Sequence, residues 1–242
     1  MPNRYFIADV HLSSTRPTTL ALWQRFIQNG PQTGDSLYIL GDLFDIWVGD
    51  DDDAPLAEQV RHTLRQLTQR GVTLGIQRGN RDFMLGTTFA RQIGATLLPD
   101  QQVLQVAGLP TLLLHGDQLC TDDHAYQKAR RCLRNPCLQW LLRHRSLAAR
   151  RRIAATYRER SLASQSQRNL DELDAVTTTV LDYLQRYQVR QMIHGHTHRP
   201  AVHQHSLPHG QIAYRYVLDE WHPTHASVWV DDGARLYCNR LS

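Results

Sequence analysis

The chain has 242 residues, of which 41% are hydrophobic and 21% are charged. A chain of this length and composition can bury a sizeable core, which excludes a disordered, collagen-like or disulfide-stapled protein. Its formal net charge of +4 hints at an anionic partner. The charge is unevenly distributed, because eleven basic residues and one acid lie between Lys128 and Arg160. This segment therefore carries +10 and the rest of the chain −6.

The sequence gives no sign of export or of a membrane span. No stretch of about 18 apolar residues occurs, so we expect no transmembrane helix. Asp9 and His11 interrupt any apolar stretch near the N-terminus, so we expect no signal peptide. None of the four cysteines forms a C-x-x-C pair. We therefore expect an intracellular protein with reduced, mostly buried thiols.

Short apolar, β-branched runs alternate with helical patterns along the chain. They predict strands over residues 5–10, 37–40, 72–76, 103–106, 111–114 and 191–193. Helices are predicted over residues 18–28 and 55–69, and Gly71 closes the second one. After Arg199 the pattern changes to hairpins, with a turn at Asp231-Asp232-Gly233 between two further strands. This alternation predicts an α/β protein with largely buried sheets.

The chain from residue 122 to about 187 interrupts this alternation with helical patterns. In its last part, i, i+3, i+4 spacing predicts one buried helix face, formed by Leu170, Leu173, Val176, Val180, Leu181 and Leu184. In the basic segment, Leu138, Trp140, Leu141 and Leu142 lie among the arginines. We expect a helical cap over residues 122–168, inserted into a single domain that spans residues 1–242.

Polar residues follow five of the apolar runs at the point where each run ends. The five clusters are Asp9-Val10-His11, Gly41-Asp42-Leu43-Phe44-Asp45, Gly79-Asn80-Arg81-Asp82, His115-Gly116-Asp117 and Gly195-His196-Thr197-His198. Each cluster alone could be a turn or a solvated loop, but α/β sheets place ligand sites at the ends of their strands. The five clusters together therefore predict one functional site.

The residue types in these clusters point to metal ions. Carboxylate, amide and imidazole ligands in one mixture suit Mn²⁺, Fe²⁺ or Zn²⁺, and no cysteine pattern indicates a structural zinc site. Two ions roughly 3.5–4 Å apart need a bridging carboxylate and can share a hydroxide nucleophile. A two-metal site is the chemistry that fits these clusters.

These motifs, in this order, resemble the signature of the calcineurin-like metallophosphoesterases. The resemblance implies a four-layer αββα sandwich, in which two mixed sheets pack face to face between helices. It implies that one metal ion is held by Asp9, His11 and His198, and the other by Asn80, His115 and His196. Asp42 would bridge the two ions.

One position departs from the general pattern of that family. Where most members have Asn-His-Glu or Asn-His-Asp, with a histidine that serves the leaving group, this chain has Asn80-Arg81-Asp82. Arg81 cannot act as an acid, because its pKa lies above about 12, but its planar fork suits phosphate oxygens. A phosphate leaving group, whose second pKa is about 6, needs charge neutralisation more than a proton. Arg81 therefore favours a pyrophosphate substrate, although a purely structural pair with Asp82 is the alternative.

The same variant resembles the UDP-2,3-diacylglucosamine pyrophosphatases of lipid A biosynthesis. The likeness runs from about Tyr5 to Asn239 and includes residues 6–9, 41–50, 79–83, 115–117 and 193–200. In that family a helical cap over the metals receives the acyl chains. The resemblance implies that the substrate contacts Asn80, Arg81, Asp123, Ser161 and His196. Two further cap positions, usually Asn and Lys, align with Gln165 and Arg168, which keep the amide and the charge but change the reach.

The resemblance also implies a mechanism. A hydroxide that bridges two divalent ions, with Mn²⁺ as the expected metal, attacks the UMP phosphorus and displaces 2,3-diacylglucosamine 1-phosphate. The expected catalytic residues are Asp42, Asn80, Arg81 and His115. The ions and Arg81 would neutralise charge on the phosphoryl oxygens in the transition state. The expected partner is a lipid-linked nucleotide sugar, with no nucleic acid and no obligate protein partner.

The basic cap favours a peripheral position on the cytoplasmic face of the inner membrane of a Gram-negative bacterium. Basic residues interleaved with Leu and Trp attract an anionic membrane surface, an attraction worth about 1 kcal/mol per residue near the surface. A diacylated substrate resides in that membrane. The alternative is that the basic residues form the solvated face of an ordinary helical insertion.

Two other functions are weighed against this one. A nuclease or cyclic-nucleotide phosphodiesterase of the same fold could track a phosphate backbone with the basic segment. That segment, however, interleaves aliphatic residues rather than aromatic residues that stack on bases, and Arg81 replaces the leaving-group histidine. A non-catalytic scaffold of the same fold should have lost metal ligands, whereas all seven expected positions are filled here.

Overall fold

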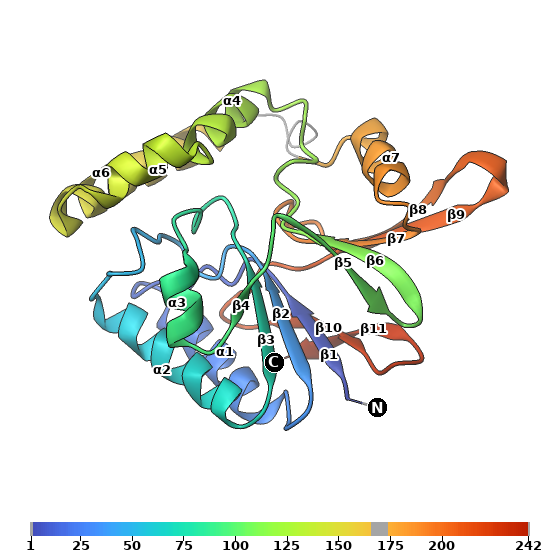
Figure 1. The fold of residues 1–242 in the computed structure, drawn as a ribbon, viewed down its shortest axis with the longest axis horizontal. Helices are drawn as coiled ribbons and strands as arrows, with labels where there is room; N and C mark the ends of the chain where they lie inside the picture. The colour runs from blue at the N-terminus through green and yellow to red at the C-terminus, as the bar shows by residue number, and fades with distance from the viewer. Residues whose placement is uncertain (1, 166–173, 242) are drawn as a thin grey trace.

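Two mixed β-sheets form the centre of the molecule (Figure 1). The computed structural model describes the backbone of residues 2–165 and 174–241 and the side chains of residues 2–158 and 174–241. The first sheet has the strand order β11 (Leu236–Leu241), β10 (Ala226–Asp231), β1 (Arg4–Ile7), β2 (Ser36–Leu40), β3 (Thr73–Gln77), β4 (Thr96–Leu97). The second has the order β5 (Gln101–Val106), β6 (Leu109–Leu114), β7 (Gln191–His194), β9 (Ile212–Val217), β8 (Ala201–Ser206). The helices are α1 (Pro17–Asn29), α2 (Pro55–Gln69), α3 (Thr87–Gln92), α4 (His124–Leu133), α5 (Pro136–Arg143), α6 (Leu147–Gln165) and α7 (Thr177–Arg186), with a 3₁₀ turn at Pro208–Gly210.

The apolar runs of β1 and β2 pack on both faces of the first sheet. Because successive side chains of a strand point to opposite faces, Ile7 and Ile39 reach one apolar cluster, and Phe6 and Leu40 reach another. The second cluster also contains Ile193 of the second sheet. The two sheets therefore pack face to face, and unbroken apolar runs are typical of strands that are buried on both faces.

Helices cover the outer face of each sheet. Trp23 of α1, Val60 of α2 and Phe89 of α3 belong to the apolar cluster on the outer face of the first sheet. Val180 and Leu184 of α7 pack on the second sheet. The molecule is thus an α/β protein with four layers, two of helices and two of mixed sheets, as the family resemblance implies.

Strand direction brings the carboxyl ends of the central strands to one edge. In the first sheet, β1, β2 and β3 run parallel to one another. In the second sheet, β6, β7 and β9 do the same. Ligand sites of α/β sheets lie outside the carboxyl ends of such strands, so the loops that follow β1, β2, β3, β6 and β7 can share one site.

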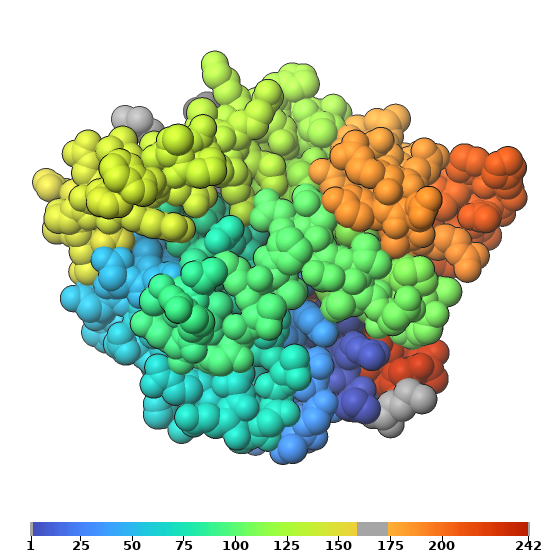
Figure 2. Space-filling model, viewed as in Figure 1, coloured from blue at the N-terminus to red at the C-terminus, as the bar shows by residue number. Residues whose placement is uncertain are grey.

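Helices α4, α5 and α6 lie together outside the four layers (Figure 1). In the space-filling view their yellow-green atoms rest along one side of the body (Figure 2). Ion pairs join them to the loops after β2 and β6: Arg150 to Asp51, and Arg130 to Asp117. These helices fall within residues 122–168, whose extent as a cap stays a prediction. No described helix is both long and apolar enough to cross a bilayer.

Two local predictions are wrong. The strand predicted over residues 5–10 ends at Ile7, because the chain turns into a left-handed conformation at Asp9, with φ of +52°. The thiols are not mostly buried, since Cys120 is buried but Cys132, Cys137 and Cys238 are exposed. Cys132 and Cys137 lie on α4 and α5, which contain no buried residue.

Other elements were missed or lie outside the described residues. Helix α3 and strand β4 have six and two residues, too few to show a periodic pattern. Of the buried helix face predicted before Tyr187, Val180 and Leu184 are buried. Leu170 and Leu173 lie outside the described residues.

Candidate active site

Three predicted ligands form a group beside β1, in which Asp9 and His11 are buried and His198 is half-buried. His11 Nε2 lies 3.3 Å from His198 Nε2. Asp9 Oδ1 lies 3.5 Å from His198 Nε2 and 4.0 Å from His11 Nε2. One ligand atom of each residue lies within 4.8 Å of the others, a spacing that can hold a metal ion.

A second group lies where β3, β6 and β7 end. Asn80 Oδ1 is 2.9 Å from His115 Nε2 and 2.8 Å from His196 Nδ1. Asp42 stands between the two groups, with Oδ2 3.9 Å from His11 Nδ1 and Oδ1 3.8 Å from His115 Nε2. The structure therefore brings all seven predicted ligands together, with one oxygen of Asp42 turned toward each group.

The polar atoms of the first group fit a cation. Asp9 Oδ1 and His11 Nδ1 are buried and have no hydrogen-bond partner. His198 Nδ1 lies 2.9 Å from a carboxylate oxygen of Glu220, which can only accept, so Nδ1 carries the hydrogen and a neutral His198 turns its Nε2 lone pair toward Asp9 and His11. Lone pairs that converge in a buried space call for a positive charge.

The pKa shifts lead to the same conclusion. Burial, helped by the carboxylates of Asp82 and Asp9, raises the pKa of Asp42 to about 7 against the opposing effects of His115 and Arg81. Burial lowers the pKa of His198, but the neighbouring carboxylates of Asp9 and Glu220 raise it to about 10. A proton thus occupies His198 when no cation is bound, and a divalent ion would release it.

The backbone of the site is held in an uncommon conformation. Eight described non-glycine residues have positive φ, and five of them are proposed metal ligands: Asp9, His11, Asp42, His196 and His198. Such residues cost energy and persist where the surrounding structure fixes them. Here Gly41 O accepts from Asp9 N at 3.2 Å, and Asp9 Oδ2 accepts from His196 N at 2.7 Å.

Two glycines allow the ligand loops to approach one another. A Cβ on Gly79 would lie 2.0 Å from Asp42 Oδ1, and one on Gly195 would lie 2.2 Å from Asp9 Oδ2. Two non-bonded heavy atoms at these distances would clash, so both positions require glycine. The glycines in the Gly79-Asn80 and Gly195-His196 motifs therefore have a packing reason.

Further contacts orient the ligands. His115 Nδ1 lies 2.9 Å from the carbonyl oxygen of Leu40, so Nδ1 donates and Nε2 keeps its lone pair for a metal. Asp82 is fully buried and accepts from the amides of Gly79 and Leu43 at 2.6 and 2.8 Å. Asp82 therefore fixes the loops, and the alternative that it pairs with Arg81 is wrong.

Arg81 instead points its guanidinium at two other carboxylates. Its NH1 donates to Asp45 Oδ1 at 3.2 Å, and its Nε lies 3.6 Å from Asp42 Oδ2. Arg158 of α6 holds the same Asp45, with Nε donating to Oδ2 at 2.7 Å. Asp45 thus joins Arg81 to α6, a contact that the motif did not predict.

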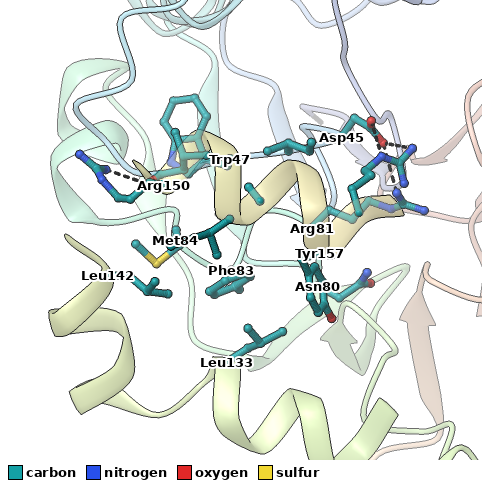
Figure 3. Close-up of a pocket in the computed structure, with 15 residues that line it drawn as sticks. Asp45, Trp47, Asn80, Arg81, Phe83, Met84, Leu133, Leu142, Arg150 and Tyr157 are labelled. Atoms are coloured by element: carbon teal, nitrogen blue, oxygen red, sulfur yellow. Dashed lines mark hydrogen bonds and ion pairs between the residues drawn. The ribbon is translucent and has the colours of Figure 1, made fainter. Parts of the chain in front are cut away.

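An apolar pocket adjoins Asn80 and Arg81. Its lining, drawn in Figure 3, includes Trp47, Phe83, Met84, Leu133, Leu142 and Tyr157. The first three follow strands β2 and β3, whereas Leu133, Leu142 and Tyr157 come from α4, α5 and α6. The pocket therefore lies between the sheet edge and these helices, with Asn80 and Arg81 at its polar end.

The remaining predicted substrate contacts are placed only in part. Asp123 is the N-cap of α4 and accepts from Tyr126 N at 2.9 Å. Ser161 and Gln165 are residues of α6, but their side chains are not among those that the structure describes. Arg168 lies outside the described residues. Their contacts with substrate stay predictions.

Sequence reasoning missed two residues beside the ligands. Tyr126 donates to Asp117 Oδ2 at 2.9 Å, and its ring centre is 5.6 Å from that of His196. Glu220, the partner of His198, follows β9. A polar residue directly after a strand is the signal that found the other ligands, but no separate strand was predicted there.

Comparisons with known proteins agree with this site. The sequence profile described as calcineurin-like phosphoesterase matches residues 3–200. The UDP-2,3-diacylglucosamine hydrolase of Edwardsiella ictaluri is 49% identical over 223 residues, which cover 92% of this chain and 86% of that protein. The protein of the same name from Tolumonas auensis is 43% identical over 229 residues, which cover 95% and 93%. This chain is therefore a hydrolase that belongs to the calcineurin-like phosphoesterases and, among them, to the family of the UDP-2,3-diacylglucosamine hydrolases.

Proposed function

We propose that the protein hydrolyses the pyrophosphate bond of UDP-2,3-diacylglucosamine, giving UMP and 2,3-diacylglucosamine 1-phosphate, with two divalent ions, expected to be Mn²⁺. One observation carries this proposal: Asn80 and Arg81 line an apolar pocket, and Asn80 also belongs to the candidate metal centre. A phosphate attached to acyl chains needs this combination of a cationic contact and an adjoining apolar space.

The seven ligands would hold the ions in two sets. Asp9, His11 and His198 would bind one ion, and Asn80, His115 and His196 the other, with Asp42 shared between them. Divalent ions at these positions would supply Lewis-acid activation of water and neutralise charge on phosphoryl oxygens. The buried hydrogen bonds of Asp82 and Leu40 keep the ligands in place before substrate arrives, so little reorganisation is needed during the reaction.

Arg81 would bind the phosphate that leaves with the lipid. Its guanidinium cannot give up a proton, but a phosphate leaving group can depart as an anion that the guanidinium stabilises. Asp45 now occupies one arm of the guanidinium. Arriving phosphate would replace or share that contact, while Arg158 keeps Asp45 neutralised.

The lipid would occupy the pocket under α4–α6. The apolar side chains of Trp47, Phe83 and Leu142 line that space (Figure 3), and burying acyl methylenes gains about 0.8 kcal/mol each. Substrate contacts by Asp123, Ser161, Gln165, Arg168 and His196 belong to the same proposal. The same proposal includes a cap over residues 122–168, in which α4–α6 supply one wall of the pocket.

Helix α5 would rest on the cytoplasmic surface of the inner membrane as part of a peripheral protein. Trp140 and Leu141 are 62% and 46% exposed, and Arg143 and Arg145 beside them are exposed as well. Exposed apolar side chains next to cations are typical of interfacial helices on anionic lipid.

Product analysis tests the reaction. Protein loaded with Mn²⁺ should release UMP and the lipid phosphate, and EDTA should abolish turnover. In ¹⁸O-water the label should appear in UMP, because water attacks the UMP phosphorus. Release of UDP and free lipid sugar, label in the lipid phosphate, or preferential cleavage of single-stranded DNA would contradict the proposal.

Vesicle sedimentation tests the membrane contact. The Trp140→Ser, Leu141→Ser double variant should lose binding to vesicles that contain phosphatidylglycerol. Val202→Ser is the matched control, because Val202 is 50% exposed on β8, outside α4–α6. Equal binding by all three proteins, or equal binding to uncharged vesicles, would contradict the proposed surface.

A further inference from the structure

His198 has an outer partner of a kind that the other oriented ligand, His115, does not have. Glu220 Oε2 lies 2.9 Å from His198 Nδ1, whereas the Nδ1 of His115 faces the uncharged carbonyl oxygen of Leu40 at 2.9 Å. A carboxylate that accepts from the far nitrogen fixes the ring and makes its other nitrogen a stronger metal ligand.

Glu220 is itself held in position from two sides. Arg16 NH1 lies 3.4 Å from Glu220 Oε1, and Arg16 NH2 donates to the carbonyl oxygen of Trp221 at 2.6 Å. The amide of Trp221 donates to Asp9 O at 3.1 Å. The segment that carries Glu220 is therefore tied both to a metal-ligand loop and to the residue that precedes α1.

The two ligand sets differ in the negative charge that surrounds them. The set of Asp9, His11 and His198 contains one carboxylate and has Glu220 behind it. The set of Asn80, His115 and His196 contains only neutral side chains, and the nearby carboxylate of Asp117, whose charge acts on both histidines, is itself paired with Arg130 at 2.7 Å. Asp42 lies between the two sets. A divalent cation gains more from the set with more negative charge around it.

We infer that Glu220 is a positioning residue that orients His198 and makes the site of Asp9, His11 and His198 the tighter of the two divalent-cation sites, with Arg16 holding Glu220 in place. The inference rests on the proposed metal centre. Glu220 does not touch substrate or the reacting atoms. It acts by fixing one nitrogen of His198 toward the ion.

Titration of the metal-free protein with Mn²⁺ tests the inference, with calorimetry for affinity and electron paramagnetic resonance for occupancy. Glu220→Ala should weaken the tight binding step by about 10- to 100-fold and leave the weak step within about twofold. Glu220→Gln keeps an oxygen acceptor without the charge, so its loss should be smaller. Arg16→Gln should give a smaller loss again, because it acts through Glu220.

A control carboxylate separates positioning from general electrostatics. Glu58 pairs with Arg61 on α2 and is 65% exposed, so Glu58→Gln should leave both binding steps unchanged. Asn80→Ala should remove the weak step, and adding Glu220→Ala should then weaken the step that remains. Thermal unfolding in EDTA should be the same for the parent and Glu220→Gln.

The following outcomes would contradict either the inference or the proposed function. Unchanged tight binding in both Glu220 variants contradicts the inference. So does an equal loss at both steps, or a loss that follows lower stability in EDTA, because either result indicates only a structural role. A parent that binds no Mn²⁺ contradicts the proposed function as well, whereas a parent that binds two ions and hydrolyses substrate leaves that proposal standing.

Discussion

The strand ends and helices α4–α6 are both rich in charged side chains, but they hold those charges in opposite ways. At the strand ends Asp9, Asp42 and His115 are 0%, 1% and 2% exposed, and the backbone of two packed sheets fixes them. Helices α4 and α5 contain no buried residue. Buried charge must be matched by another charge or a ligand, whereas exposed ion pairs contribute little and weaken in salt.

More charges of the basic segment, residues 128–160, are paired within the protein than its net charge of +10 suggests. At least five of its arginines pair with aspartates of the body: Arg130, Arg134, Arg150, Arg151 and Arg158. Their partners lie in the loops after β2 and β6 and between β4 and β5. At least five of the eleven basic residues of the segment therefore attach α4–α6 to an acidic body.

The largest expected effect comes from Asp42 at the strand ends. Asp42→Asn should lower turnover by about 10³-fold, near the upper end of what one electrostatic group supplies, because the shared negative charge between the ligand sets is lost. The same variant should bind fewer Mn²⁺ ions. UMP release and metal stoichiometry measure both effects, with Asp182→Asn as control, because the Asp182 carboxylate lies on α7 and is 55% exposed. Undiminished turnover would remove Asp42 from the proposed centre.

Arg81 lies where the two regions meet, and its loss should have the next largest effect. Arg81→Ala should lower kcat by about 10²-fold, since one preorganised charge is removed from the developing anion. Arg81→Lys keeps the charge without the fork and should recover part of the rate. Arg91→Ala on α3, outside the pocket, is the control. An effect on KM alone would show that Arg81 only binds substrate.

Arg150 tests how α6 shapes the pocket. Its NH1 donates to Val48 O at 2.7 Å and also pairs with Asp51, and residues 45–48 form one pocket wall. Arg150→Ala should raise KM for the diacylated substrate about tenfold, a coupling of ~1.4 kcal/mol, with kcat nearly unchanged. A double-mutant cycle with Asp51→Asn measures how much of this loss belongs to the pair. Full additivity would assign the effect to the Val48 contact.

Asp117 should affect acid stability rather than turnover. Burial raises the pKa of Asp117, but the charges of His115, Arg130 and Arg134 outweigh burial and hold it well below its usual range. Its stabilisation is therefore complete above the unfolded pKa of about 3.9 and is lost as pH falls toward the folded value.

Urea unfolding at pH 7, 5 and 3 in EDTA measures this contribution. Asp117→Asn should be less stable than the parent by roughly 1–3 kcal/mol at pH 7, and the difference should shrink at pH 3. Asp182→Asn on α7 is the control, since that carboxylate is 55% exposed. A difference that grows in acid would reverse the assigned sign.

The ligand positions could be predicted because they follow apolar strands. Asp9, Asp42 and Asn80 lie two or three residues after the ends of β1, β2 and β3, and parallel strands bring those ends together. Glu220 could not be found in this way, because the strand before it was predicted only as part of a hairpin region. Asp82 belongs to one of the predicted motifs. Whether its carboxylate accepts from backbone amides or pairs with Arg81 depends on how three loops meet, which the sequence does not show.

The arrangement of α4–α6 was harder to predict for another reason. Leucines among arginines indicate helices, yet the chain alone does not show which arginines turn inward. Arg150 reaches Asp51 across 99 positions of sequence, and no local pattern records a contact of that length. The even spread of basic residues suggested an outward-facing surface, whereas tertiary ion pairs draw several of them to the body.

The positive φ of Asp9, His11 and Asp42 affects which substitutions remove activity without disturbing the loops. It also affects which substitutions relatives accept when they lose activity. Alanine at these positions must adopt a conformation that costs most residues about 1–2 kcal/mol, whereas asparagine enters it readily. An alanine scan would therefore mix lost chemistry with a reshaped loop. Asparagine would give inactive protein that keeps its shape, the form suited to trapping bound substrate. Relatives that lose activity by drift should pass through asparagine or glycine there before other residues.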